Sequence, residues 1–528
     1  MTIAAPPERF NFAAHLSTLN ASRAARTAYV DDTGSIGYGE LDARAARFAG
    51  GLGALGLRRE ERVLLLMHDC IDWPVAFLGC LRAGVVPVAV NTLLTVDDYA
   101  YMLDHSRARA AIVSAALVPI LGQAMARATH EVTRLLVSTR GAPFCADPSV
   151  PSDDLEAWLP GQPTAPPADT RGDDMAFWLY SSGSTGRPKG TVHTHANLYW
   201  TAALYGGPVL GLTEADVCFS AAKLFFAYGL GNALTFPLSA GATTVLMAER
   251  PTPDAVFRRW TGPQRPTVFF GAPTGYAGML ASAALPARDQ VALRLCSSAG
   301  EALPREIGER FGARFGCEII DGIGSTEMLH VFLSNRPGDV RYGTTGKPVD
   351  GYRVELRDDS GAPIEGAEQI GDLYIEGPSA ALMYWADRAR SRASFQGAWT
   401  KSGDKYFRDA DGYYVYAGRG DDMLKVSGQY VSPFEVESTL MQHPAVLEAA
   451  VIGVDDPQGL TRAKAFVVMK DPAHATEAMS AELQAFVKAR LAPFKYPRQI
   501  AFVVELPKTA TGKIQRFRLR EAERGTGT

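Results

Sequence analysis

Short apolar runs recur along this chain and alternate with segments of helical character such as "DDYAYMLDHS" (97–106). Strands that are apolar on both faces and separated by helices are typical of parallel sheets covered by helices. We therefore predict an α/β fold, with a large multi-lobed N-terminal domain of mixed and parallel sheets. The predicted strands are "RVLLLM" (62–67), "RAAIVSA" (109–115), "MAFWLY" (175–180), "TTVLMA" (243–248) and "PTVFFGA" (266–272).

The 528 residues suffice for three to four domain-sized units or one large multi-lobed enzyme. Residues 141–174 are rich in Pro, Asp and Ala, and we predict that they cross the surface between two lobes. We place a domain boundary between Gly420 and Asp421, which gives domains of residues 1–420 and 421–528.

The smaller domain has an α+β pattern, with strands at "EAAVIGV" (448–454) and "AKAFVVM" (463–469) and a helix at "SAELQAFVKARL" (480–491). Its first helix is predicted at "VSPFEVESTL". There Ser432 caps the helix, Pro433 takes the first position and Glu435 closes a capping box.

The bulk composition excludes several classes of protein. A net charge of −4 argues against nucleic acid as a partner. The six cysteines are scattered without a CxxC pair, which fits a reducing compartment and neither a zinc site nor a disulfide framework. The N-terminus has no signal-peptide pattern, and there is no apolar run of about 18 residues. We predict a cytoplasmic protein that does not contact a membrane.

Two nucleotide-binding signatures are incomplete in this chain. Gly51, Gly53 and Gly56 in "GLGALG" have dinucleotide-binding spacing, but they follow a helical pattern and precede a strand, the reverse of the required order. We interpret them as a turn that ends a helix. The two Gly-Lys pairs, at 346–347 and 512–513, are followed by Pro348 and Ile514, so neither completes a P-loop.

The stretch "YSSGSTGRPKG" (180–190) has the chemistry of a polyphosphate site. Glycines let the backbone approach an anion, hydroxyls supply donors, and Lys189 adds a positive charge. The alternative is a flexible polar loop. Thr194 is predicted to cap a helix that follows.

The stretch, extended to "YSSGSTGRPKGTVHTHAN", resembles the signature loop of the adenylate-forming superfamily, which comprises acyl-CoA synthetases, carrier-protein adenylation domains and firefly-type luciferases. Further segments resemble that family in order and spacing: "SSAGEALP" (297–304), "DGIGSTE" (321–327), "KSGDKYFRDADGYYVYAGRGDD" (401–422) and "PKTATGKIQR" (507–516). Together they span about Phe177 to Arg516.

The resemblance implies ATP, Mg²⁺ and coenzyme A as the cofactors and co-substrates. Lys513, Thr326, Glu327 and Lys189 would be catalytic, with Glu327 binding the metal through its carboxylate. The implied ATP-binding residues are Ser181, Ser182, Gly183, Ser184, Thr185, Gly186, Lys189, Ala299, Gly300, Glu301, Asp321, Gly322, Ile323, Thr326, Asp404 and Arg419.

The resemblance also implies a two-step reaction. A carboxylate attacks the α-phosphorus of ATP to give an acyl adenylate and pyrophosphate, and the thiol of CoA then displaces AMP. Between the steps the small domain would rotate about Asp421, moving Lys513 away and bringing Gly428 beside the CoA tunnel. From local sequence alone, Asp421 and Gly428 are also ordinary turn residues. Acylation of Lys513 by a lysine acyltransferase, reversed by a deacylase, would stop the first step alone.

The segments "KLFFAYGLGNALTFPL" and "GIGSTEMLHVFLSN" most closely resemble benzoate-CoA ligases. Ile323 departs from the family's aromatic residue against adenine, and Phe226 from its frequent histidine. We expect an aromatic acid as substrate, and His330 either orients a ring substituent or packs. The expected pocket residues are Phe226, Ala227, Tyr228, Gly324, His330 and Val331.

Several alternatives remain at this point. Val331 stands where we expect isoleucine, so hydroxy-, amino- or halobenzoates remain open as substrates. The other activities are carrier-protein loading, luciferase-type oxygenation and non-catalytic ATP binding; a homodimer is also open. His193 and His195 are interpreted as structural residues in preference to a metal pair. The basic residues Lys508, Lys513, Arg516, Arg518 and Arg520 are interpreted as a phosphate-facing edge, not as an RNA site.

Overall fold

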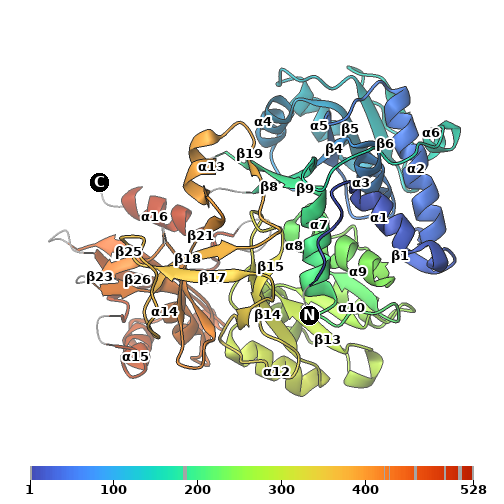
Figure 1. Cartoon of the computed structure of the whole chain (residues 1–528). Coiled ribbons are helices and arrows are strands. Elements are labelled where there is room, and N and C mark those ends of the chain that lie inside the picture. The colour runs from blue at the N-terminus through green and yellow to red at the C-terminus, as the bar shows by residue number, and fades with distance from the viewer. Residues whose placement is uncertain are drawn as a thin grey trace.

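A computed structural model of the chain shows a large N-terminal domain of helix-covered sheets and a small C-terminal domain with its own sheet (Figure 1). The structure describes residues 3–181, 187–420, 422–426, 429–456, 461–492, 495–508 and 514–525. The α/β fold predicted from the alternating pattern is confirmed. Among the described helices, none combines the length and the apolar character needed to cross a bilayer.

An eight-stranded sheet forms the first lobe. Alternate residues of its strands point to opposite faces, so Val63 and Leu65 join a core with helices α1 (Phe12–Leu19), α2 (Tyr38–Ala54) and α3 (Asp72–Ala83). Leu64 and Leu66 join a second core with α4 (Val96–Ser106) and α5 (Val118–Met125). The strand order is β19 (Met383–Tyr384), β9 (Lys189–Thr194), β8 (Met175–Ser181), β4 (Val86–Ala89), β3 (Arg62–Leu66), β5 (Ala108–Ser114), β6 (Arg134–Ser138) and β7 (Ser152–Asp154).

A nine-stranded sheet forms the second lobe. Helices α10 (Pro253–Trp260), α11 (Pro273–Ala281) and α12 (Arg305–Phe315) cover one face. The other face packs against residues of a five-stranded sheet. The nine strands follow the order β16 (Lys347–Pro348), β15 (Val331–Ser334), β14 (Ile319–Gly324), β13 (Leu295–Ser298), β12 (Val268–Gly271), β10 (Val217–Ser220), β11 (Thr243–Val245), β1 (Thr27–Asp31) and β2 (Gly34–Gly37).

The five-stranded sheet is antiparallel, and it lies between the second lobe and the small domain in Figure 1. Strands β21 and β22 of this sheet carry Asp404 and Arg419 directly opposite each other. The strands are β17 (Arg353–Arg357), β18 (Gly371–Glu376), β20 (Phe395–Gln396), β21 (Trp399–Arg408) and β22 (Tyr414–Arg419).

The small domain is built on a three-stranded sheet of β25 (Val446–Asp455), β26 (Thr461–Met469) and β27 (Gln499–Phe502). Helices α14 (Pro433–Met441) and α15 (Glu477–Lys488) bury one face, and α16 (Arg516–Gly525) packs against the other. The short strands β23 (Leu424–Val426) and β24 (Gln429–Val431) pair with each other beside it. The predicted strands and the α15 helix are confirmed.

The cap of α14 is confirmed, but the capping box is not. The Ser432 side chain accepts a hydrogen bond from the main-chain N–H of Glu435 at 3.1 Å. The Glu435 carboxylate instead binds the ammonium of Lys495 at 2.7 and 2.8 Å. The local pattern predicts that the Glu435 side chain binds its own backbone, but the opposite charge of Lys495 binds it instead.

The prediction that residues 141–174 cross between two lobes is wrong. The segment follows β6 and precedes β8, and both strands belong to the eight-stranded sheet. It contributes the edge strand β7 and the short helix α6 (Leu155–Trp158). Leu155 is fully buried, and the ring of Trp158 lies 6.0 Å from that of Phe48. The apolar patch in this polar segment is therefore the part that anchors it to the lobe.

Helix α2 extends further than predicted, because Gly51 and Gly53 belong to it. The turn comes at Gly56, whose φ is 79°. A Cβ atom on Gly51 would lie 2.2 Å from the Trp158 ring, so the glycine permits close packing. The predicted order of helix, turn and strand is confirmed.

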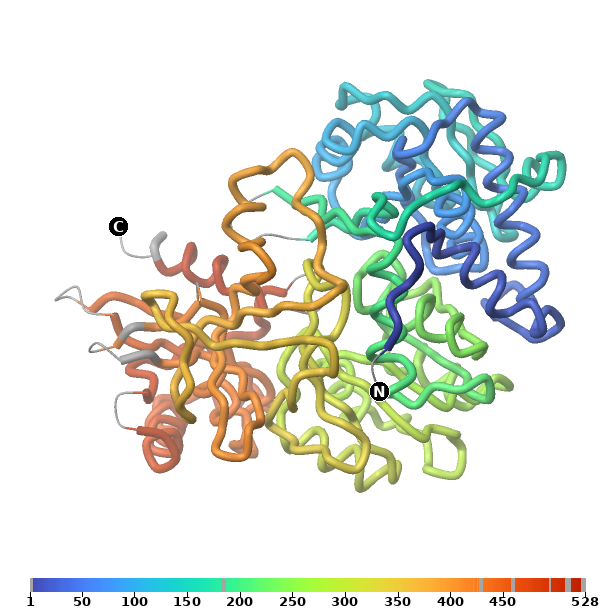
Figure 2. The backbone as a smooth tube through the Cα atoms, in the orientation of Figure 1, coloured from blue at the N-terminus to red at the C-terminus, as the bar shows by residue number. Residues whose placement is uncertain are grey.

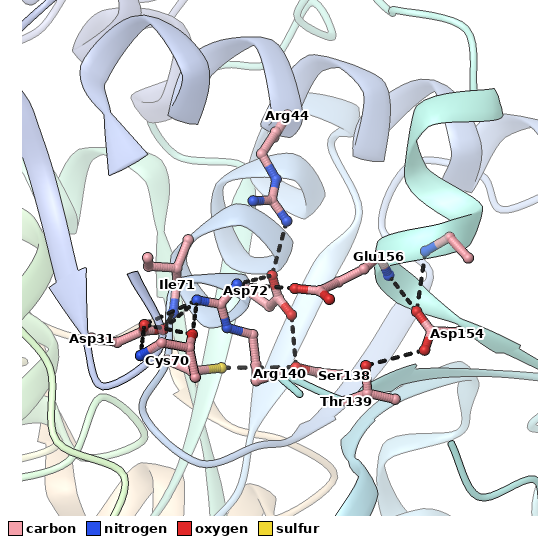
Figure 3. Close-up of polar contacts among 12 residues, drawn as sticks. Asp31, Arg44, Cys70, Ile71, Asp72, Ser138, Thr139, Arg140, Asp154 and Glu156 are labelled. Carbon is pink, nitrogen blue, oxygen red and sulfur yellow. Dashed lines mark hydrogen bonds and ion pairs between the residues drawn. The ribbon is translucent and has the colours of Figure 1, made fainter. Parts of the chain in front are cut away.

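The two lobes are joined by a buried cluster of charges (Figure 3). Asp31 ends β1 of the nine-stranded sheet, and both its oxygens lie 2.9 Å from the guanidinium of Arg140, which follows β6. Arg140 also lies 4.0 Å from Asp72, a fully buried carboxylate that Arg44 and Ser138 contact at 3.0 and 2.8 Å. The N-terminal segment, dark blue in Figure 2, contacts α7 (His195–Thr201), where the Tyr199 hydroxyl donates to the main-chain oxygen of Ala4 at 2.8 Å. These contacts fix the lobes whose edges form the site described next.

Candidate active site

The polar stretch 180–190 joins two strands at one edge of the first lobe. Ser181 ends β8 and Lys189 begins β9, and the two residues are directly opposite in the antiparallel ladder. Ser182, Gly183, Ser184, Thr185 and Gly186, all predicted ATP-binding residues, lie outside the described residues. The Ser181 hydroxyl is buried and has no hydrogen-bond partner within the described part of the chain. The helix after the stretch is capped as predicted, with a full capping box between Thr194 and Asn197.

Lys189, Glu327 and Tyr384 form a compact polar cluster. The Lys189 ammonium lies 3.5 Å from Oε1 of Glu327 and donates to the Tyr384 hydroxyl at 3.1 Å. That hydroxyl donates to the same Oε1 at 2.7 Å. Burial opposes ionisation of Glu327, but Lys189 and Tyr384 outweigh it and lower the pKa of the carboxyl. Glu327 is therefore ionised and held in one orientation.

Tyr384 was missed by the sequence analysis. It lies in the run "ALMYW", which carries no recognisable motif. Only the pairing of β19 with β9, across almost 200 residues of chain, brings it beside Lys189. No local signal in the sequence marks such a contact.

His193 supports Thr326, another predicted catalytic residue. Its Nε2 donates to the main-chain oxygen of Thr326 at 2.8 Å, and its ring stacks on Phe177 at 5.1 Å. Burial lowers the pKa of His193 to about 4, so the ring is neutral. His195 serves another segment, since its Nδ1 accepts from the main-chain N–H of Phe12. Within the described ranges no group of three or more His, Cys, Asp or Glu side chains is arranged to hold a metal ion.

Two of the predicted ATP-binding segments, in the runs 297–304 and 321–327, meet at the carboxyl ends of β13 and β14, which are parallel neighbours. Ligands of open α/β sheets bind at this edge. Gly300 has a φ of 95° in the turn after β13. Asp321 is buried, and this burial raises the pKa of its carboxyl to about 8. The turn includes Ala299, Gly300 and Glu301, and β14 carries Asp321, Gly322 and Ile323.

Gly322 lets β15 approach β14 closely. A Cβ atom there would lie 2.8 Å from Val331 and 2.9 Å from the oxygen of Leu333. Ile323 is half-buried and packs against the apolar core shared with the five-stranded sheet.

Asp404 and Arg419, two of the predicted ATP-binding residues, form an ion pair at 3.1 Å. The guanidinium lines a recess of about 400 Å³ together with Lys401 and Lys405. Asp372 accepts from both ammonium groups, at 2.9 and 3.1 Å. Arg419 and Gly420, which line the recess, directly precede the predicted hinge residue in the sequence.

The predicted acyl-pocket residues are brought together around the start of α8 (Ala227–Leu230). The Tyr228 hydroxyl donates to Ser297 Oγ at 3.0 Å, and the Tyr228 ring lies 5.5 Å from that of His330. Gly324 is needed where it stands, because a Cβ atom would lie 2.5 Å from the oxygen of His330. Phe226 packs against the neighbouring Phe225 ring, and Val331 is buried.

His330 is a neutral, enclosed ring. Burial lowers its pKa to about 3. Its Nε2 lies 3.3 Å from the oxygen of Tyr228 and 3.2 Å from Oδ1 of Asn232, so Nε2 carries the proton. Nδ1 is then an acceptor, and it has no partner among the residues that the structure describes. The ring is 4.4 Å from Phe236, which accounts for its packing role.

Three residues of the basic edge of the small domain form ion pairs within the domain. Arg516 binds Glu437 at 2.7 Å, and Arg520 binds Asp422 at 2.8 Å. Lys508 binds Glu448 at 2.5 Å. Our interpretation of this edge as phosphate-facing stays a prediction. Lys513, Asp421 and Gly428, predicted as catalytic lysine, hinge and tunnel residue, lie outside the described residues.

Known proteins are similar to this chain over nearly its whole length. A benzoate–CoA ligase of Thauera aromatica is 56% identical over 98% of this chain and 97% of its own length. The crystal structure of a benzoate CoA ligase from Burkholderia xenovorans LB400 is 62% identical, with a TM-score of 0.89, 97% of this chain covered and 100% of that chain. An anthranilate CoA ligase in complex with anthranoyl-AMP is 41% identical, with a TM-score of 0.93 over 99% and 98% of the two chains.

Family models match both parts of the chain. Residues 17–385 match the AMP-binding enzyme family, and residues 435–513 match the AMP-binding enzyme C-terminal domain. The chain belongs to the AMP-binding enzyme family, whose members include acyl-CoA synthetases that form adenylates.

Proposed function

We propose that this protein is an ATP-dependent benzoate–CoA ligase, an AMP-forming acid–thiol ligase. The observation that carries the proposal is the full-length identity of 56% to one benzoate–CoA ligase and 62% to the crystal structure of another. The apolar, ring-lined surroundings of Tyr228 and His330 fit a flat aromatic acid. The identity extends over both domains, and the two domains together would carry out both half-reactions.

In the first half-reaction one oxygen of benzoate attacks the α-phosphorus of ATP, and the bond from that phosphorus to the bridging oxygen of pyrophosphate breaks. The products are benzoyl-AMP and pyrophosphate. Lys189 and Lys513 would offset the negative charge that builds on the phosphates. Thr326, anchored by His193, would present its hydroxyl to a phosphate oxygen.

The chemistry of Glu327 fits a magnesium ligand. Its carboxylate is ionised and orientated, and both of its side-chain contacts in the described residues fall on Oε1. Magnesium in phosphoryl-transfer sites takes one or two carboxylates together with substrate phosphates. When bound, Mg²⁺ neutralises phosphate charge and orients the leaving pyrophosphate.

In the second half-reaction the thiolate sulfur of CoA attacks the benzoyl carbon, and the bond to the AMP oxygen breaks. The products are benzoyl-CoA and AMP. We propose that the small domain, beginning at Asp421, turns between the two steps and brings Gly428 to the thiol path. The proposed boundary falls just after β22 ends at Arg419 and between the two family matches, which end at residue 385 and begin at 435.

The residue roles follow the resemblance and the geometry together. Asp404 and Arg419 would bind the ribose, and Asp321 and Ile323 would contact the adenine. Asp321 is suited to an exocyclic amine because its buried Oδ1 has no partner within the described ranges. We infer a cytoplasmic location, where ATP and CoA are both present and the buried thiols stay reduced.

An amino-substituted benzoate is the second candidate substrate. The observation in its favour is the likeness to the anthranilate CoA ligase, together with the buried acceptor at His330 Nδ1. The test is AMP release by purified protein with MgATP and CoA, for benzoate, 2-aminobenzoate, 4-hydroxybenzoate and octanoate. We expect benzoate to lead and octanoate to be poor. Preference for octanoate would overturn the pocket assignment, and a lead for 2-aminobenzoate would favour the second candidate.

A further inference from the structure

A short segment that no motif marks reaches across the site and contacts both of its charged groups. This segment, residues 378–385, is called the strap here. Its Ala381 N–H donates to the main-chain oxygen of Glu327 at 2.8 Å. Further along, the N–H of Leu382 donates to Val192 at 2.9 Å and that of Trp385 to Gly190 at 2.8 Å. The strap therefore ties the Glu327 segment to β9, the strand that carries Lys189.

The strap is itself rigidly held. The Asn197 side chain donates to the oxygens of Pro378 and Ala380 at 3.2 and 3.1 Å. The Ser379 hydroxyl donates to the oxygen of Met328 at 2.8 Å. At the other end the Tyr384 N–H donates to Ser391 Oγ at 3.0 Å, from helix α13 (Arg388–Ser394). These hydrogen bonds hold the backbone from which the Tyr384 side chain projects in one position.

Tyr384 projects from the strap to a point between Lys189 and Glu327. The hydroxyl accepts from Lys189 and donates to Glu327, at 3.1 and 2.7 Å. The ring lies under the Lys189 ammonium, with 4.3 Å from nitrogen to ring centre, and packs against Phe395. Tyr384 is 3% exposed, so these contacts are screened from water.

We propose that Tyr384 is the positioning residue that orients the Glu327 carboxylate and the Lys189 ammonium for Mg²⁺ and the phosphates of ATP; this inference rests on the proposed function. Without the hydroxyl, opposite charges at 3.5 Å would close into a direct ion pair. With it, Oε1 of Glu327 keeps a donor when Lys189 turns to a phosphate. Both groups are thus kept apart and available.

The decisive variant is Y384F, which removes the hydroxyl and keeps the ring over Lys189. The matched control is Y352F. Tyr352 is also a buried tyrosine, and its hydroxyl lies 2.6 Å from Ser379 Oγ of the same strap, but it does not contact either charged group. The readout is the dissociation constant of magnesium α,β-methylene-ATP, measured by calorimetry at several Mg²⁺ concentrations with no acid present.

We expect Y384F to weaken binding of this analogue about tenfold, the usual scale for a lost hydrogen bond to a charged group. Excess Mg²⁺ should restore part of the loss, and Y352F should stay within about twofold of the unchanged protein. Thioester formation from supplied benzoyl-AMP should be unaffected by Y384F. Equal affinity in Y384F and the unchanged protein, or an equal loss in Y352F, would overturn the proposal.

A double-mutant cycle separates positioning from general damage. Because part of the effect of Tyr384 acts through Glu327, the Y384F change should weaken analogue affinity less in an E327Q background than in the unchanged protein. Additive losses would contradict the proposal even if Y384F alone were less stable. Because binding is measured without an acid, failure of the protein to activate benzoate would sink the proposed function and leave this test intact.

Discussion

His195 is a buried neutral ring, and replacing it with glutamine should weaken the acid sensitivity of the fold. The main-chain N–H of Phe12 donates to its Nδ1, so that nitrogen holds no proton. Burial lowers the pKa of His195 to about 4, against 6.5 for an unperturbed histidine. The unfolded chain therefore binds a proton at this residue below pH 6.5 that the folded chain binds only near pH 4. Its contribution to stability is present above pH 6.5 and is lost as the pH falls towards 4.

The loss can be worked out from these two values. At pH 5 the unfolded histidine is almost fully protonated and the folded one is about one-tenth protonated, which removes about 2 kcal/mol from the free energy of unfolding. The lowered pKa values of His193 and His330 likewise reduce the free energy of unfolding as the pH falls. Asp69 and Asp321 act in the opposite sense, because burial raises the pKa of the first to about 6 and that of the second to about 8. The informative quantity is therefore the difference between H195Q and the unchanged protein.

The assay is equilibrium urea unfolding, followed by tryptophan fluorescence at pH 7.5, 6.5, 5.5 and 5.0. H195Q is expected to gain about 2 kcal/mol relative to the unchanged protein between pH 7.5 and pH 5, whatever its offset at pH 7.5. His474, which is exposed, provides the control H474Q, and this variant should follow the unchanged protein. Parallel curves for H195Q and the unchanged protein would refute the argument that this ring is neutral when folded.

Three further predictions concern the lobe contact, the pocket and the metal. R140M removes the cation between Asp31 and Asp72 and should lower the free energy of unfolding by about 3–5 kcal/mol in urea titrations, with partial recovery in R140M/D31N; no change in stability would contradict the role of the cluster. V331I adds one methylene to the pocket and should lower kcat/KM for ring-substituted benzoates up to about fivefold relative to benzoate, whereas a general loss on all acids would argue against a local effect. EDTA should stop benzoyl-AMP formation and spare thioester formation from supplied benzoyl-AMP, as followed by chromatography of both products; equal loss of both steps would argue against a metal that serves only the ATP phosphates.

Much of the fold could be predicted from the sequence because its signals are local. The strand "RVLLLM" is apolar on both faces, and Ser432 and Thr194 stand at cap positions that need only neighbouring residues. The predictions that are wrong concern contacts between segments far apart in the chain. Residues 141–174 were predicted to cross between lobes because their polar composition gives no sign of the edge strand β7. The Glu435 side chain binds Lys495, which is 60 residues away, and not its own backbone.

The candidate site shows the same division. Short motifs gave Lys189, Glu327 and the turn after β13, since each motif keeps its residues within a few positions of one another. Tyr384 gave no signal, because its environment is made by segments far apart in the chain. The ion pairs of Arg516 and Arg520 likewise depend on how α16 packs, which a count of basic residues cannot show.

In the proposed reaction a carboxylate oxygen of benzoate attacks the α-phosphorus of ATP. The most direct test uses benzoate labelled with ¹⁸O in both carboxylate oxygens, incubated with the protein, MgATP and CoA, and mass spectrometry of the products. Attack at the α-phosphorus would leave one ¹⁸O in AMP, one in the carbonyl of benzoyl-CoA and none in pyrophosphate. Label in inorganic phosphate with ADP as the nucleotide product would contradict it, because benzoate would then have attacked the γ-phosphorus.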